Sequence, residues 1–192
     1  PGFDADEGAL PPEADVVYNL LELHYWDGVG SSVALTPAAG LQAGVAPSPE
    51  KSFASGGFHS HPFFGVSDPA GLPAEGVYVG KLTVSVEGLA DSDPYYMVSL
   101  VSDVVTGLPT NEAQVEAAEA IGEMVRLYAE DSMANPAPIY GGTDFTFYAQ
   151  TVAHVRALAA IPEPTTSMLA GGLLLLTVAR RPGRRDPWAC KN

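Results

Sequence analysis

The chain has 192 residues, with 23 acidic and nine basic side chains and a formal net charge of −14. Residues 1–161 hold 21 of the acidic residues and four basic ones, so the net charge of this part is near −17. With no basic stripe to displace counterions from phosphates, this part is not expected to bind nucleic acid. Its charge fits a surface protein that attracts cations or basic partners, or one whose acidity serves solubility alone.

We divide the chain into a flexible N-terminal segment (residues 1–14), a β-rich domain (15–160), a C-terminal signal (161–185) and a tail (186–192). The domain is large enough for one hydrophobic core. The single cysteine, Cys190, lies in the tail, so no disulfide is expected in the domain.

Alternating apolar and polar residues predict a first strand at residues 16–26. One face is predicted to carry Val17, Leu21, Leu23 and Tyr25, and the other Glu22, His24 and Trp26. A short strand is predicted at 31–36. The Ala-, Gly-, Pro- and Ser-rich stretch 37–57 predicts a long loop.

Residues 77–87 have the clearest strand pattern, with Tyr78, Leu82, Val84 and Val86 on an apolar side and Lys81, Thr83, Ser85 and Glu87 on a wet side. Residues 95–101 predict an antiparallel partner strand, reached through a turn at 90–94. A last strand is predicted at 144–150, with Phe145 and Phe147 pointing inward and pairing that continues to residue 157.

One helix is predicted at residues 111–130, where apolar residues recur at helical spacing. Asn111 is the predicted N-cap, and Gln114 completes a capping box. Several antiparallel strands and one helix predict a mainly β fold, namely a β-sandwich or jelly-roll-like domain with one inserted α-helix.

The sharpest local feature of the domain is His59-x-His61, because alternate residues of an extended segment point to the same side. A zinc site needs three or four ligands, so His24 and one of Glu22, Asp68 or His154 are candidates to complete it. Imidazole and carboxylate together suit zinc or another first-row metal and not calcium. The alternative is a polar patch in which the two histidines pack beside Phe58, Phe63 and Phe64.

No nucleophile elbow or phosphate-binding glycine loop is present, so we do not expect an enzyme. A zinc-dependent hydrolase remains the least favoured alternative, with Glu22 or Asp68 as the nearby base. Tyr25 and Trp26 are candidates for stacking on a polysaccharide, although aromatic residues on a strand usually belong to the core.

The C-terminal signal has three parts: Pro162-Glu163-Pro164, the charge-free segment 165–179, and the arginines Arg180, Arg181, Arg184 and Arg185. An apolar segment followed by arginines predicts a membrane helix with a cytoplasmic basic end. At a rise of 1.5 Å per residue the charge-free segment reaches roughly 22 Å, short of the ~30 Å hydrocarbon core, which favours a transient anchor.

These three parts in this order resemble the PEP-CTERM sorting signal of bacterial surface proteins. The resemblance implies processing near Pro162-Glu163-Pro164 by an exosortase, an integral-membrane cysteine protease, and delivery to the cell surface or extracellular polymer matrix. It also implies a secretory signal peptide, which we expect upstream of Pro1. Residues 186–192 continue past the arginines, where such signals usually stop. The alternative is an ordinary C-terminal anchor behind a proline-rich linker.

Residues 55–130 contain short motifs that resemble a group of PEP-CTERM proteins known from cyanobacteria and regulated by the zinc-uptake repressor. The motifs are His59-x-His61-Pro62-x-Phe64-Gly65, Gly76-Val77-Tyr78, Leu89-Ala90-Asp91-Ser92-Asp93-Pro94 and Asn111-Glu112. This resemblance implies a role in zinc capture or zinc sparing at the cell surface, with His59 and His61 as the site.

The sequence therefore predicts an exported surface or matrix protein, anchored transiently in the inner membrane and able to bind zinc through His59, His61 and His24. The alternative is a structural or polysaccharide-binding matrix protein without a metal site.

Overall fold

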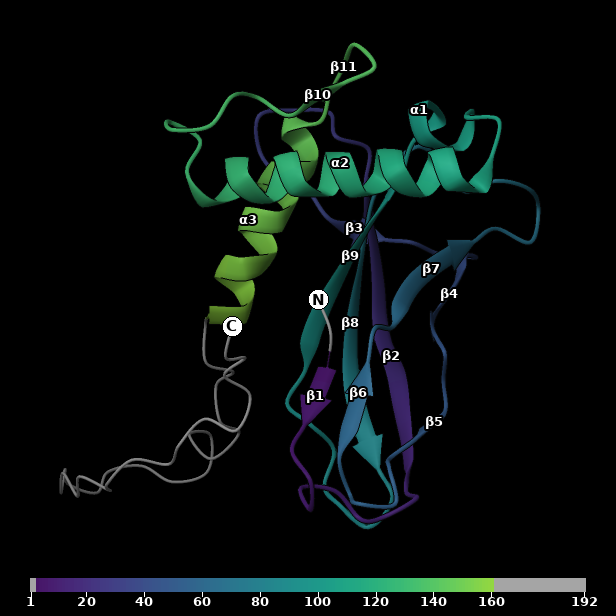
Figure 1. Ribbon diagram of the computed structural model, residues 1–192. Helices are drawn as coiled ribbons and strands as arrows, with labels where there is room; N and C mark the ends of the chain where they lie inside the picture. The colour runs from purple at the N-terminus through teal and green to yellow at the C-terminus, as the bar shows by residue number, and fades with distance from the viewer. Residues whose placement is uncertain (1–2, 161–192) are drawn as a thin grey trace, which may run out of the picture.

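The computed structural model describes residues 3–160 (Figure 1). The predicted processing motif Pro162-Glu163-Pro164, the membrane segment and the arginine cluster lie outside the described residues. Within residues 3–160 no helix is long and apolar enough to cross a membrane.

The predicted fold class is confirmed in its main feature, because the described chain is mainly β and every strand pairing is antiparallel. The strands are β1 (Phe3–Ala5), β2 (Asp15–Trp26), β3 (Thr36–Pro37), β4 (Gln42–Ala46), β5 (Glu50–Lys51), β6 (Phe58–Ser60), β7 (Phe63–Ser67), β8 (Gly76–Val86), β9 (Tyr95–Val101), β10 (Ile139–Tyr140) and β11 (Thr143–Asp144). The helices are α1 (Asp103–Thr106), α2 (Asn111–Glu130) and α3 (Thr146–Ala160).

A five-stranded sheet forms the centre of the described chain, in the order β3-β2-β8-β9, with β5 also paired to β2. Its two long strands, β2 and β8, are those with the clearest alternation in the sequence. β9 has the predicted bounds and pairs with β8 as expected, with Tyr95 opposite Leu82 and Val101 opposite Gly76. Three two-stranded sheets, β1-β6, β4-β7 and β10-β11, complete the pairing.

A register shift in β2 corrects the predicted faces of this strand. Leu20 lies opposite Leu82 and Glu22 opposite Lys81, so Leu21 is an extra residue that inverts the alternation. Leu21 is therefore exposed, and Val17 does not share a face with Leu23. The apolar face of β2 carries Val16, Tyr18, Leu20, Leu23 and Tyr25.

The small sheets β1-β6 and β4-β7 cover this apolar face. The ring of Phe3 lies 5.6 Å from that of Tyr18 and 5.3 Å from that of Tyr95, measured between centroids. From β7, Phe64 reaches Gly80 on β8. The predicted apolar side of residues 77–87 is confirmed, since Tyr78 and Leu82 are buried. The predicted wet side is wrong over most of the strand, because Val77, Val79 and Thr83 on it are also buried, Lys81 and Ser85 are half-buried, and Glu87 alone is exposed.

Helices α2 and α3 pack on the opposite face, near the end of the sheet that contains Trp26. In Figure 1, α2 crosses this end of the sheet and α3 descends beside β9. The core between the helices contains Ile121 and Val125 of α2 together with Phe145 and Ala149. The ring of Phe147 makes an edge contact with the buried Trp26 at 6.4 Å, which joins this core to the sheet.

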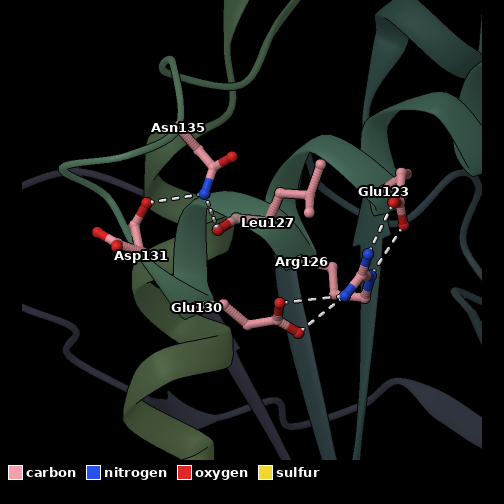
Figure 2. Close-up of polar contacts among 6 residues, drawn as sticks. All are labelled: Glu123, Arg126, Leu127, Glu130, Asp131 and Asn135. Atoms are coloured by element: carbon pink, nitrogen blue, oxygen red, sulfur yellow. Dashed lines mark hydrogen bonds and ion pairs between the residues drawn. The ribbon is translucent and has the colours of Figure 1, made fainter.

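The bounds of α2 are as predicted, but its N-cap is not Asn111. Thr110 has extended backbone angles, and its side chain accepts the Ala113 N–H at 3.2 Å. At the other end, the Asn135 amide donates to the carbonyls of Leu127 and Asp131, which closes the last turn (Figure 2).

The predicted strand at 144–150 is wrong, because this region forms α3, and α1 is a further unpredicted helix. Phe145 is buried as expected, but it precedes a helix and not a strand. Thr151 and Val155 are buried and lie four residues apart, as on one face of a helix. The alanines of this segment have the highest helix propensity of all residues.

The structure also differs from the sequence predictions in three other segments. Of the predicted strand at 31–36 only Thr36 is in a strand, β3. The predicted loop at 37–57 contains β4 and β5. In the segment predicted as flexible, β1 pairs with β6, and hydrogen bonds join Gly8 to Ser55 and Ala14 to Ser52.

Candidate functional site

His59 and His61 lie together on the surface beside the carboxylate of Asp4. The two imidazole rings meet edge to face, with their centroids 4.6 Å apart. The Asp4 Oδ1 atom makes a close contact with His59 Nδ1. The structure thus places the two histidines side by side, as alternation along an extended segment requires. It adds the carboxylate of Asp4, which no sequence pattern marks.

Pairing of β1 with β6 positions this cluster, because it sets Asp4 directly opposite His59. On β6, Phe58 and Ser60 are buried, so the intervening His59 points outward. The Ser60 hydroxyl donates to Glu50 and fixes the inner side of the strand. On β1, the ring of Phe3 is anchored between Tyr18 and Tyr95.

The cluster is open to solvent, with side-chain exposures of 54% for His59 and 56% for Asp4. A neutral His59 that donates its Nδ1–H to Asp4 keeps the Nε2 lone pair directed away from the carboxylate. This arrangement is common around metal ions in proteins, where a carboxylate orients the imidazole and increases its basicity. A protonated His59 forms an ion pair with Asp4 instead.

His24 occupies a different part of the molecule. It lies on β2, and its Nε2 atom is 3.8 Å from Glu22 Oε2, while Lys81 approaches the same carboxylate at 3.9 Å. The register of β2 places these side chains on the face of the central sheet that also carries Trp26 and the helices, whereas the β1-β6 pair lies over the opposite face. The structure therefore separates His24 from the His59–His61 pair.

The other candidate ligands do not complete the pair. Asp68 accepts the Ala70 N–H at 2.7 Å within its own turn, and His154 lies on α3. In residues 3–160 no group of three or more His, Cys, Asp or Glu side chains is arranged to hold a metal ion.

Two hollows in the surface of residues 3–160 lie away from the histidines. One, of about 200 Å³, is bounded by β9 and the helices and lined by Val98, Ser99, Leu100, Val105, Ala118, Ile121 and Tyr148. Burial raises the pKa of the Tyr148 hydroxyl in this region. The other, of about 440 Å³, lies between α2 and α3. Neither hollow brings a histidine toward a second possible ligand.

The candidates for stacking on a sugar belong mainly to the core. Trp26 is 2% exposed, which leaves no face for a ligand. Tyr25 packs on Tyr78 at 5.0 Å, and its hydroxyl donates to the Glu75 carbonyl. Among residues 3–160, the exposed aromatic side chains are instead Phe53 and Phe63, which flank the histidine segment in the sequence.

Comparison with known proteins identifies no relative of this chain. No protein-family model matches the chain, and searches of curated proteins and of solved structures find no match.

Proposed function

We propose that this chain is an exported bacterial surface or matrix protein that binds a first-row metal ion, zinc above all, through His59 and His61. The observation that supports metal binding is the Asp4–His59–His61 cluster, in which two imidazoles adjoin and a carboxylate contacts one of them. The observation that supports export is the ordered C-terminal pattern of Pro162-Glu163-Pro164, apolar segment and arginines.

Two imidazoles supply half of a tetrahedral coordination shell. Water or a group from another molecule would fill the remaining positions. Such an open, exposed site is suited to capture and exchange of a metal ion and not to a permanent structural role. Residues 1–161, with a net charge near −17, would raise the local concentration of cations.

Export would follow the route that the PEP-CTERM resemblance implies. An exosortase would recognise Pro162-Glu163-Pro164, and residues 165–179 would form the transient membrane helix held by Arg180, Arg181, Arg184 and Arg185. The domain would then remain at the cell surface or in extracellular polymer.

The two small sheets β1-β6 and β4-β7, which lie against the central sheet, support the finer assignment of the fold as a β-sandwich. Its second layer would be made of these short strands.

The second candidate is a structural or polysaccharide-binding matrix protein without a metal site. It is favoured by the lack of a third convergent ligand within residues 3–160. We do not assign an enzyme, and a zinc hydrolase is disfavoured because Glu22 contacts His24 and not the His59–His61 pair.

The first test is the metal content of the full chain, purified without a His tag from cells grown with trace zinc. Metal binding predicts near-stoichiometric zinc and a higher melting temperature on zinc addition, both lost in the His59→Ala/His61→Ala variant. His24→Ala/His154→Ala is the matched control and should keep both properties. A wild-type chain that contains no zinc and does not respond to saturating zinc would leave the matrix-protein candidate.

A further inference from the structure

β9 is an edge strand of the central sheet, and its outer side is unpaired within the described chain. All seven residues pair with β8 on one side without a bulge, and no other strand of residues 3–160 pairs with β9. Its sequence, Tyr-Tyr-Met-Val-Ser-Leu-Val, has no charge, no proline and no glycine. The alternate N–H and C=O groups on its outer side therefore form a template for another strand.

The opposite edge of the sheet is protected in ways that β9 is not. β3 has two residues and ends at Pro37, which cannot donate a ladder hydrogen bond. β5 also has two residues, and its Lys51 forms an ion pair with Asp15 at 2.7 Å. Short strands, proline and lysine are the usual devices that prevent edge-to-edge pairing. The contrast between the two edges indicates that β9 accepts a partner.

The helices leave this edge available because they pack on a face of the sheet. Val98 and Leu100 point toward Ala118, Ile121 and Tyr148, and line the hollow there. None of the hydrogen bonds outside the strand ladders in residues 3–160 involves a backbone group of β9.

Exposed carboxylates stand at both ends of β9. Asp91 and Asp93 precede the strand, and Asp103 follows it, with its N–H donating to the carboxylate of Glu75. Pairing of two copies about Val98 would set Asp93 against Asp103. It would also bring together two chains whose residues 1–161 each have a net charge near −17. The charge distribution therefore disfavours a second copy and favours a partner with basic ends.

We infer that β9 binds an extended segment of another polypeptide, with alternating apolar residues in its middle and Lys or Arg at both ends. The segment would add to the central sheet as a further strand. Main-chain hydrogen bonds would supply affinity, and the flanking carboxylates would select basic ends. This inference is independent of the metal site.

The test uses the full chain and a labelled probe, the peptide Lys-(Thr-Val)4-Thr-Lys, with binding followed by fluorescence polarisation at low salt. Strand addition predicts saturable binding that is at least tenfold weaker when both lysines are replaced by glutamate. N-methylation of the peptide amides along both edges should abolish binding, because it removes the donors of the ladder. Bound peptide should also slow hydrogen exchange of β9 amides.

Matched variants test the carboxylates. Asp93→Asn/Asp103→Asn should weaken binding of the basic peptide, whereas Glu116→Gln/Glu119→Gln, on an exposed part of α2, should leave it unchanged. Equal binding of the unmodified and N-methylated peptides, or no binding, would overturn the inference. A dimer of the chain alone with protected β9 amides would overturn the choice of partner.

Discussion

The ring of Phe64 on β7 lies directly against Gly80 on β8. A Cβ atom at position 80 would come within 2.6 Å of Phe64 Cζ and 3.2 Å of Leu20 Cδ1. This contact holds the β4-β7 sheet on the central sheet, and it requires a residue without a side chain.

Gly80→Ala should therefore lower the free energy of unfolding by about 1–3 kcal/mol, the usual cost of overpacking a core. Gly122→Ala is the matched control, since a Cβ there meets nothing within 4 Å and alanine favours a helix by about 1 kcal/mol. Urea denaturation of the full chain measures both. Equal stability of the two variants would show that Phe64 moves aside without cost.

The buried hydroxyl of Tyr95 has no hydrogen-bond partner within the described structure. Burial raises the pKa of this phenol, in agreement with an environment that disfavours the phenolate. Tyr95→Phe removes an unsatisfied polar group, whose burial costs about 1–3 kcal/mol, so the variant should be at least as stable as the wild type.

Tyr18→Phe is the control for Tyr95→Phe, because the Tyr18 hydroxyl donates to Glu50 Oε1 at 3.4 Å. Loss of this long bond should not stabilise the protein. Thermal denaturation followed by circular dichroism compares the two variants, and a clear loss of stability in Tyr95→Phe would reveal a partner for its hydroxyl.

The position of the N-cap gives a third prediction. Thr110→Ala removes the acceptor for the Ala113 N–H and should destabilise the protein by about 0.5–2 kcal/mol. Asn111→Ala lies at the first helical residue and should be neutral or slightly stabilising, because alanine is the better helix former. Chemical denaturation measures the free energy of unfolding of both variants. A larger loss of stability in Asn111→Ala than in Thr110→Ala would mean that Asn111 is the N-cap, as the sequence predicts.

The fold could be predicted from the sequence where apolar residues follow a strand or helix pattern over a long continuous segment. β8, β9 and α2 were each recognisable from alternation or helical spacing over seven or more residues. The bulge at Leu21 was not, because an extra residue is defined only by the register with the partner strand. Thr146, Phe147 and Tyr148 are residue types typical of strands, yet they begin α3, because this segment packs on α2.

In the candidate site, too, features set by local spacing could be predicted, whereas features set by long-range strand pairing could not. Adjacency of His59 and His61 follows from their spacing, whereas the contact of His59 with Asp4 joins residues 55 positions apart. No local pattern marks Asp4, since it depends on pairing of β1 with β6. The separation of His24 likewise depends on which face of β2 it occupies.

Arg126 provides a prediction about pH. Its guanidinium donates to Glu123 at 2.7 and 2.8 Å and to Glu130 at 2.9 and 3.1 Å (Figure 2). The hydrogen bonds between Arg126 and Glu123 lower the pKa of Glu123 below its ordinary value of 4.5. The stabilisation that this carboxylate contributes is therefore present at neutral pH and is lost as the pH falls through the lowered pKa.

Arg126→Gln should raise the pKa of Glu123 toward its ordinary value, as measured by NMR titration of the side-chain carboxyl carbon. Its effect on stability should be small and sensitive to salt, because the groups are exposed to solvent. Arg156→Gln, on α3, is the control and should leave the titration of Glu123 unchanged. An unchanged titration in Arg126→Gln would mean that the paired geometry is not maintained in solution.

The contact of Asp4 with His59 gives a prediction that is specific for the proposed metal site. Asp4→Asn keeps the size of the side chain but removes its charge, so His59 loses the carboxylate that orients its ring. Removal of such a supporting carboxylate typically weakens metal affinity 10–100-fold, and we expect a loss in this range for zinc. Competition with a chromophoric chelator measures the affinity of the full chain.

Asp6→Asn is the matched control, because Asp6 is an exposed acidic residue two positions away and its carboxylate has no hydrogen-bond partner within the described residues. Both variants change the net charge equally, so a purely long-range attraction of zinc by the acidic domain would weaken binding in both to the same extent. A selective loss in Asp4→Asn, with unchanged melting of the metal-free protein, would assign the effect to the contact with His59. Equal losses would mean that only the acidity of the domain contributes to zinc binding and that Asp4 does not support the site.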